Sequence, residues 1–340
     1  MTDEASASKL DDLPDVSRRR FLAGAGGTLT GVAAVRAVDN VLLGYGELGY
    51  GTNLLEQELR PLVTENLGLG YDEQVSGTRL RLAEGTLEVS AGDGEHRFAL
   101  DADARAAVGD LDAELGLSGR LGALYADASD VSAGGYEMAF SQPGAFFERV
   151  AAAEPRPDLV GAMRGWTDRL VDPDVVEEFA DAPPGEPAAL VDALVGAFRE
   201  HATYDVTRYV AGSIQDNVIF GAADLRSQLS GPVTFEAMLE NDDTGLFCYE
   251  LAVRSMEALH AVAPWHQQTP VATVYVRDAR HKHVYTGIAS AIREDGDLVV
   301  PMTFVDYTHS TLYDDLGATP VMGRGLAAYD DRHRATEMYW

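Results

Sequence analysis

Cysteine and lysine are almost absent from this sequence of 340 residues. Its one cysteine, Cys248, excludes an intrachain disulfide and leaves either a small buried side chain or a thiol kept for chemistry. Lysine occurs only as Lys9 and Lys282, and Lys+Arg number 26 against 55 Asp+Glu. No basic stripe is available to neutralise phosphates, which argues against a nucleic-acid partner. The sequence also contains neither a phosphate-binding loop nor a dinucleotide fingerprint, so we expect no organic cofactor.

The shortage of basic residues leaves a net charge of -29 and a pI near 4.4. Carboxylates in this excess repel one another in dilute buffer and destabilise the compact state. In about 1 M salt the Debye length falls to about 3 Å, which screens most of that repulsion. The composition resembles the surfaces of proteins from salt-loving archaea. We therefore interpret the charge as a halophilic adaptation to the solvent.

Long apolar runs are lacking as well. A weakly apolar stretch from Phe21 to Val35 is rich in Gly and Ala, and it is shorter than the roughly 20 residues that span a bilayer. It follows Ser17-Arg18-Arg19-Arg20-Phe21-Leu22, which matches the pattern of a twin-arginine export signal. We expect residues 1–37 to be this signal, the protein to be exported or held at the cell surface, and no stable membrane span beyond the signal segment.

The first half of the chain predicts a small mixed α+β domain, residues 38–184. Alternating apolar and polar residues over 78–100, interrupted by Gly-containing turns, predict an antiparallel meander. A helix is expected over 101–117 and a strand over 134–140. A Pro- and Gly-rich segment, 181–186, marks the expected end of this domain.

The second half, residues 185–340, predicts an α+β domain in which a helix precedes an antiparallel sheet. An amphipathic helix is expected over 188–201, and a longer helix begins near Thr244. Three strands are expected after it, and they cover 271–276, 283–292 and 298–305.

The long helix carries Cys248 near its start. With Asp243 or Thr244 as N-cap, Cys248 falls in or just after the first turn. The positive end of the helix there favours a thiolate, and its amides can bind a developing oxyanion. His283 opens the second strand and Asp306 closes the third, with a turn between them, so antiparallel pairing brings the two side chains together. A thiol, an imidazole and a carboxylate in one unit predict a catalytic triad.

Three short segments resemble the transglutaminase-like superfamily of papain-like cysteine enzymes. They are Gly245-x-x-Cys248 at a helix start with Ala252 further on, a strand that begins at His283, and Val305-Asp306 before Thr308. The resemblance implies a papain-like fold for the second domain and a protein or peptide substrate. It also implies that Cys248 attacks a glutamine side chain or peptide carbonyl, His283 moves the proton and Asp306 orients His283. Candidates for a side-chain oxyanion donor are Gln215, Asn217 and Asn241.

Two other functions are compatible with the sequence. Transglutaminase-like folds also serve as inactive binding or scaffold domains, and Tyr285 stands where the family often has a tryptophan. Alternatively, His281 and His283 point to one face of a strand and, with His309 and a carboxylate, could bind zinc. We favour the interpretation that most of the histidines in this part of the chain, His260 included, lie at the surface, and we expect no metal site.

Overall fold

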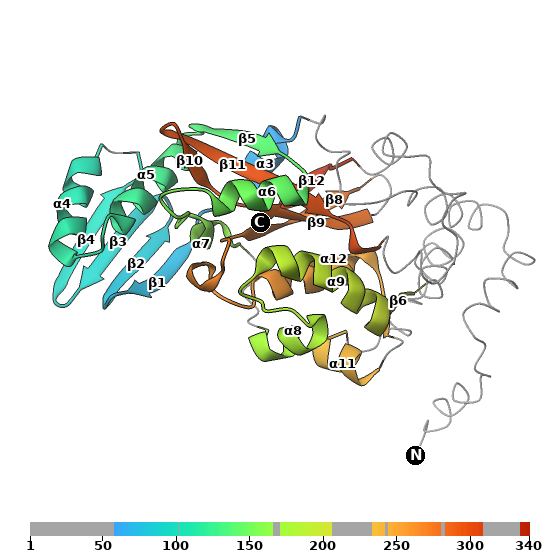
Figure 1. Cartoon of the computed structure of the whole chain (residues 1–340). Helices are drawn as coiled ribbons and strands as arrows, with labels where there is room; N and C mark the ends of the chain where they lie inside the picture. Colours follow the sequence, from blue (N-terminus) through green and yellow to red (C-terminus); the bar gives the residue numbers. More distant parts are fainter. Residues whose placement is uncertain are drawn as a thin grey trace, which may run out of the picture.

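The computed structural model describes residues 58–101, 103–165, 171–205, 233–241, 244–279, 283–308 and 334–340. The expected export signal lies outside these residues. The described part is α+β, as predicted, with a four-stranded antiparallel sheet and a curled, mixed six-stranded sheet (Figure 1). Within it, none of the helices combines the length and the apolar character that crossing a membrane requires.

The predicted meander is present, with one more strand than the sequence indicated. Consecutive strands pair in the order β1-β2-β3-β4. Their bounds are β1 Tyr71–Val75, β2 Thr78–Ala83, β3 Thr86–Ala91 and β4 Gly94–Ala99. Tight turns join them: Glu84 and Gly85 have φ of 50° and 72°, the left-handed region that suits a two-residue hairpin. Strand β1 was not predicted because Asp, Glu and Gln fill its centre and hide the apolar alternation.

Three helices belong to this part of the chain: α3 (Arg60–Asn66), which contacts β12 (Glu337–Tyr339) of the second sheet, α4 (Arg105–Leu115) and α5 (Arg120–Ser132). Helix α4 lies inside the range predicted for it. The buried carboxylate of Asp112 accepts hydrogen bonds from the backbone N–H groups of Gly119 and Leu121, both at 2.6 Å, and of Gly122 at 3.1 Å. Asp112 thereby supplies acceptors to the first amides of α5, which have no partner inside the helix.

The second sheet has the order β10-β11-β9-β8-β12, and β5 runs parallel to β11. Its strands are β5 Tyr136–Phe140, β8 Ala272–Asp278, β9 His283–Ala289, β10 Ile292–Glu294, β11 Asp297–Val305 and β12 Glu337–Tyr339. The strand expected over 283–292 is in fact two, because the chain leaves β9 at Ser290, whose hydroxyl donates to the carbonyl of Pro270. Strands β10 and β11 then form a hairpin through Asp295 and Gly296.

Both faces of this sheet are covered. One face shares a core with the meander, α3 to α5 and α7 (Val160–Met163). The other face packs against five of the described helices: α6 Pro143–Ala151, α8 Pro173–Ala180, α9 Pro187–His201, α11 Phe235–Glu240 and α12 Cys248–Leu259. The remaining described elements are the strands β6 Ala202–Tyr204 and β7 Thr244–Leu246 and a short 3-10 turn, Pro264–His266. All 7 residues of β9 are therefore buried.

Helix α9 confirms the amphipathic helix predicted from the sequence. Leu190, Leu194 and Phe198 on its inner side are fully buried, and Val195 is partly buried. The division of the chain at residues 184 and 185 stays a prediction, although β5 from the first half lies in the sheet of the second.

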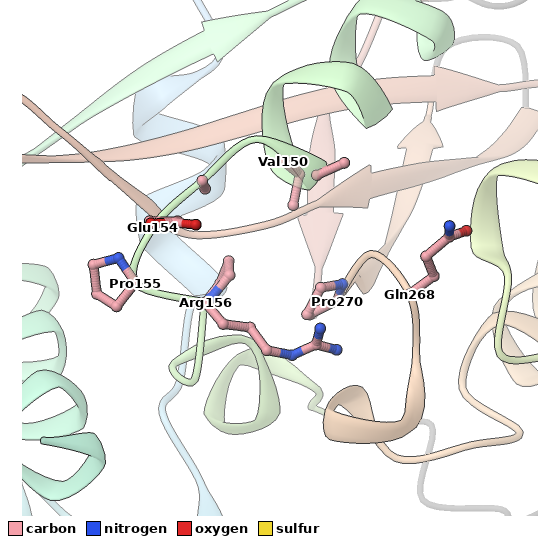
Figure 2. A pocket seen from close by; sticks show the side chains of 9 residues that line it. Val150, Glu154, Pro155, Arg156, Gln268 and Pro270 are labelled. Atoms are coloured by element: carbon pink, nitrogen blue, oxygen red, sulfur yellow. The ribbon is translucent and has the colours of Figure 1, made fainter. Parts of the chain in front are cut away.

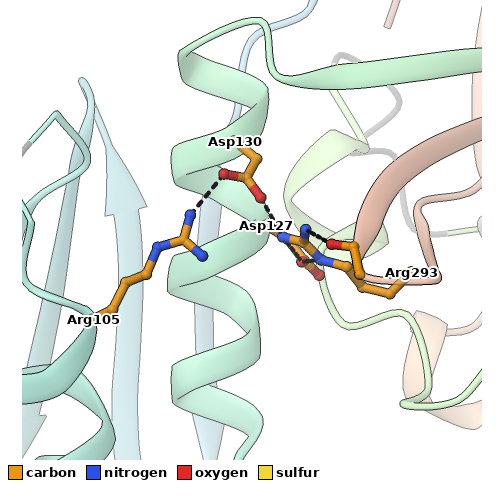
Figure 3. A network of polar contacts seen from close by, with 5 residues as sticks. Arg105, Asp127, Asp130 and Arg293 are labelled. Atoms are coloured by element: carbon orange, nitrogen blue, oxygen red, sulfur yellow. Dashed lines mark hydrogen bonds and ion pairs between the residues drawn. The ribbon is translucent and has the colours of Figure 1, made fainter.

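A network of ion pairs joins the two halves of the chain. Figure 3 shows Arg293 of β10 between Asp127 and Asp130 of α5, with Arg105 of α4 beside Asp130. Arg293 Nε donates to Asp127 at 2.8 Å. Burial raises the pKa of Asp127, and the nearby Arg293 only partly offsets this. The network therefore fixes the β10–β11 hairpin against α5.

Candidate functional site

Cys248 is the first residue of α12, so the helix begins four residues later than the sequence suggested. The expected start near Thr244 was wrong because Thr244–Leu246 form β7, which pairs in parallel with β6. Phe247 is the N-cap, and the carboxylate of Glu250 accepts its backbone N–H at 2.6 Å. Of the two predicted N-caps, Thr244 instead donates its hydroxyl to the carbonyl of Asn241, and Asp243 lies outside the described residues.

Helix α12 lies on β8 and β9, and this packing fixes the position of the thiol. Cys248 forms a small apolar cluster with Ala252 and Val284, and its residual exposure is 9%. One turn further along, the hydroxyls of Ser255 and Thr286 are 2.6 Å apart and buried. The helix is thus held to β9 by an apolar contact near its first turn and a hydrogen bond in the middle.

His283 and Asp306 meet as the strand pairing predicted. Strands β9 and β11 are antiparallel, His283 opens β9, and Asp306 directly follows β11. His283 Nε2 lies 2.6 Å from Asp306 Oδ2, and the two side chains are only 1% and 2% exposed. The other carboxylate oxygen accepts the backbone N–H of Thr308 at 3.0 Å. Both oxygens of Asp306 therefore have hydrogen-bonding partners, which fixes its orientation.

The three predicted residues come together, because the side chain of Cys248 is hydrogen-bonded to His283. Because Nε2 of the ring is paired with Asp306, Nδ1 is the ring nitrogen that remains for a second hydrogen bond. Burial alone lowers the pKa of His283. The charge of Asp306 and the hydrogen bonds to Asp306 and Cys248 more than reverse this and raise it to about 10. The pairing with Asp306 therefore favours the imidazolium form of His283, which can donate a proton.

Helix α9 contacts the residue that follows Asp306 in the chain. Tyr307, next to Asp306, is buried, and its ring packs edge-on against Phe198 with centroids 5.3 Å apart. Its hydroxyl donates to the carbonyl of Val191 at 3.3 Å. The conformation of the chain after β11 thus depends on the core formed by α9.

A pocket of about 480 Å³ lies beside Cys248, and the sequence did not reveal it. Its lining residues are Asn66, Tyr249, Tyr275, Tyr339 and Trp340. Tyr275 also packs against the apolar cluster that contains Cys248. The one signal in the sequence was Tyr249, the neighbour of Cys248, since the other walls come from α3, β8 and the end of the chain.

A second depression, of about 330 Å³, lies between the end of α6 and the turn before β8 (Figure 2). Arg156 is its one cationic lining residue among those described, and its guanidinium donates to the carbonyls of Pro264 and Gln267. These residues follow the C-terminal end of α12, whereas Cys248 is at the other end, about 16 Å away at 1.5 Å per residue. This depression is separate from the triad.

The histidines give no support to a metal centre. His281 and His309 lie outside the described residues, as do Gln215 and Asn217, while Asn241 is exposed at the end of α11. In the part of the chain that the structure describes, no group of three or more His, Cys, Asp or Glu side chains is arranged so that it could hold a metal ion. The expectation that His260 lies at the surface was wrong: it is buried, and its Nε2 accepts the backbone N–H of Thr273 at 3.0 Å. Burial, followed by the charge of Arg164, lowers its pKa.

No protein-family model, no curated protein and no solved structure matches this chain. The site is therefore described by its own chemistry. A thiol at the positive end of a helix is hydrogen-bonded to an imidazole, which in turn is paired with a buried carboxylate. Groups of these types in this order can form and break acyl bonds.

Proposed function

We propose that the chain is an exported thiol enzyme of the transglutaminase-like type, with a papain-like second domain, that transfers or hydrolyses the acyl group of an amide in a protein or peptide. The observation that carries the proposal is the unbroken series of contacts from Cys248 through His283 to Asp306. The three residues come from three separate elements, so chance proximity along the chain does not explain their meeting.

Acylation begins from the ion pair in which the proton of the Cys248 thiol has passed to His283, so that Cys248 reacts as a thiolate and His283 is an imidazolium. The thiolate sulfur attacks the amide carbonyl carbon, so a C–S bond forms and the π electrons of the carbonyl move to oxygen. The positive end of α12 favours that oxyanion. The oxyanion then collapses, the C–N bond breaks, and the imidazolium of His283 gives its proton to the departing nitrogen. Ammonia or an amine leaves, and a thioester remains on Cys248.

Deacylation runs the proton in the opposite direction. The now neutral His283 takes a proton from water or from an amine as it attacks the thioester carbonyl. The C–S bond breaks, the thiolate leaves, and His283 is again an imidazolium. Asp306 keeps the ring oriented and stabilises its positive charge in both steps. Water as the acceptor gives hydrolysis, and an amine gives crosslinking.

Alkylation of the single thiol tests the triad without knowledge of a substrate. In molar salt at pH 6.5 we expect iodoacetamide to label folded protein faster than urea-unfolded protein, with His283→Ala removing that advantage. Ser255→Ala is the matched control, because it alters a buried contact of the same helix and leaves the imidazole in place. Labelling that occurs only on unfolding would show an inert cysteine and would favour the inactive binding domain.

Turnover is tested with glutamine-containing peptides and a biotinylated primary amine. The expected result is amine incorporation or ammonia release that Cys248→Ser abolishes. If the thiol is rapidly labelled but no such peptide reacts, the triad stands and the glutamine substrate class is wrong.

A further inference from the structure

We propose that the pocket beside Cys248 binds an aromatic side chain of a polypeptide, placed next to the amide that the thiol attacks. This proposal rests on the proposed function for its reaction, and on separate observations for its ligand. The pocket, called the tyrosine pocket below, is formed by Asn66, Tyr249, Tyr275, Tyr339 and Trp340.

The first observation is the position of the tyrosine pocket relative to the thiol. Tyr249 is the next residue after Cys248 in α12, and Tyr275 of β8 contacts the cluster of Cys248, Ala252 and Val284. A side chain that occupies the pocket therefore places its own backbone close to the sulfur. The volume of the tyrosine pocket, about 480 Å³, falls within the range of about 300–1,000 Å³ that is usual for ligand sites.

The second observation is the arrangement of the rings. Tyr275 lies between Tyr249 and Tyr339, with ring centroids 6.0 Å and 6.3 Å away and interplanar angles of 71° and 56°. Strand pairing produces this order, since Tyr339 of β12 is directly opposite Tyr275. Aromatic pairs are attractive at centroid separations of about 4.5–7 Å. A further ring can continue the row.

The third observation is exposure. Only three large hydrophobic side chains are exposed among the described residues, and two of them, Tyr249 at 50% and Tyr339 at 38%, belong to this pocket. Exposed aromatic residues gathered at one concave place are typical of binding sites. The third, Trp265, lies elsewhere, in the turn after α12.

The fourth observation is that the lining is neutral on a strongly acidic protein. The lining residues comprise one amide and four aromatic side chains, on a chain with 55 acidic residues. Three of the polar side-chain atoms donate within the protein: Asn66 Nδ2 to the carbonyl of Met338, Trp340 Nε1 to that of Val63, and the Tyr339 hydroxyl to Glu337. The walls are held in place and select a neutral, flat group by its ring faces.

Binding to a catalytically dead protein separates this proposal from the proposed function. Calorimetry on Cys248→Ala would compare two peptides of equal length that differ only in phenylalanine or alanine beside the glutamine. We expect the phenylalanine peptide to bind about tenfold more tightly, since an aromatic pair and the buried ring together contribute more than about 1.4 kcal/mol. When Tyr249→Ala or Tyr339→Ala is combined with Cys248→Ala, the ratio of the affinities for the phenylalanine and alanine peptides should fall at least threefold. Trp265→Ala, the matched control, should leave that ratio unchanged.

Each outcome bears on one proposal. Equal binding of the two peptides, or an equal loss in Trp265→Ala, overturns the tyrosine pocket as an aromatic site, even if wild-type protein turns substrates over. An aromatic preference that depends on Tyr249 and Tyr339, without turnover of these peptides by wild-type protein, supports the pocket and refutes the glutamine substrate class of the proposed function. Circular dichroism of each variant identifies any that fail to fold, and Tyr339→Phe then replaces Tyr339→Ala, with its aromatic preference expected to persist.

Discussion

Replacing Asp306 by asparagine removes one charge of the buried pair and keeps the size of the side chain. The ring nitrogen and the carboxylate oxygen are 2.6 Å apart, at 1% and 2% side-chain exposure. Removing one partner of a buried ion pair costs about 3–5 kcal/mol. Burial lowers the pKa of His283, while Asp306 and Cys248 raise it, with a net rise from 6.5 to about 10. At about 1.36 kcal/mol for each pKa unit, the linked free energy is at most about 5 kcal/mol, in the same range.

The pH dependence of this contribution has a definite sign. The folded-state pKa of His283 is above its unfolded value, so the stabilisation is complete below about pH 6.5 and is lost as the pH rises through about 10. Lysine and cysteine contribute little between pH 7 and 10, because the chain has two lysines and one cysteine. Its 14 tyrosines, with an ordinary pKa of about 10, are present in Asp306→Asn and in its parent alike, so the difference between the two proteins isolates the pair. Cys248→Ala is introduced into both the wild-type protein and Asp306→Asn. It removes the thiol that is hydrogen-bonded to the ring of His283. In that background the difference in the free energy of unfolding between the parent and Asp306→Asn should fall by about 2–3 kcal/mol from pH 7 to pH 10.

Urea unfolding in molar salt, followed by tryptophan fluorescence, measures both effects. Asp306→Asn should lower the free energy of unfolding by about 3 kcal/mol at pH 7 and by much less at pH 10. Asp72→Asn is the matched control, because Asp72 pairs with Arg79 at 2.7 Å but at 48% and 60% side-chain exposure. Such a surface pair contributes about 0–1 kcal/mol. A cost for Asp306→Asn that is equal at the two pH values, or no larger than that of Asp72→Asn, would refute the charged pair.

Three further changes test the fold by the same unfolding assay at pH 7. Asp112→Ala leaves the amides at the start of α5 without their buried acceptor and should cost about 2–3 kcal/mol; a cost near zero would mean that water replaces the carboxylate. Phe198→Ala opens a cavity under Tyr307 and should cost about 3–5 kcal/mol, against less than about 1.5 kcal/mol for Phe198→Leu if the site repacks. Arg293→Gln leaves Asp127 and Asp130 without their shared cation and should cost about 2 kcal/mol or more; a loss as small as that of an exposed ion pair would contradict the joining role of the network.

The contact between His283 and Asp306 was predictable because it depends on local order along the chain. His283 and Asp306 are on two strands that pair antiparallel, so the start of one must lie beside the end of the other. Apolar alternation and a Gly-containing turn were enough to indicate those strands. Cys248 could be assigned to the start of a helix from its neighbours, although the exact start was missed. The competing strand pairing of Thr244–Leu246 with β6 is a contact across the fold, and no local signal reveals it.

The tyrosine pocket was not predictable for the opposite reason. Its walls combine the end of α3 with α12, β8 and the last two residues of the chain, and only the pairing of β12 with β8 brings Tyr339 opposite Tyr275. A strand of three residues carries no periodic pattern of its own. His260 was assigned to the surface for a similar reason. Its ring is buried because the backbone N–H of Thr273 supplies a hydrogen bond from another element.

Salt and burial act on different charges in this protein. The carboxylate excess that produces the net charge of -29 repels across solvent, where about 1 M salt reduces the range of the interaction to about 3 Å. The pair of His283 and Asp306 is nearly inaccessible to solvent and is joined at hydrogen-bonding distance, so mobile ions screen it much less. Salt also has little charge to screen in the tyrosine pocket, because its lining side chains are neutral. An acid-rich surface can therefore adjust to concentrated salt without changing the electrostatics on which the proposed thiol chemistry depends.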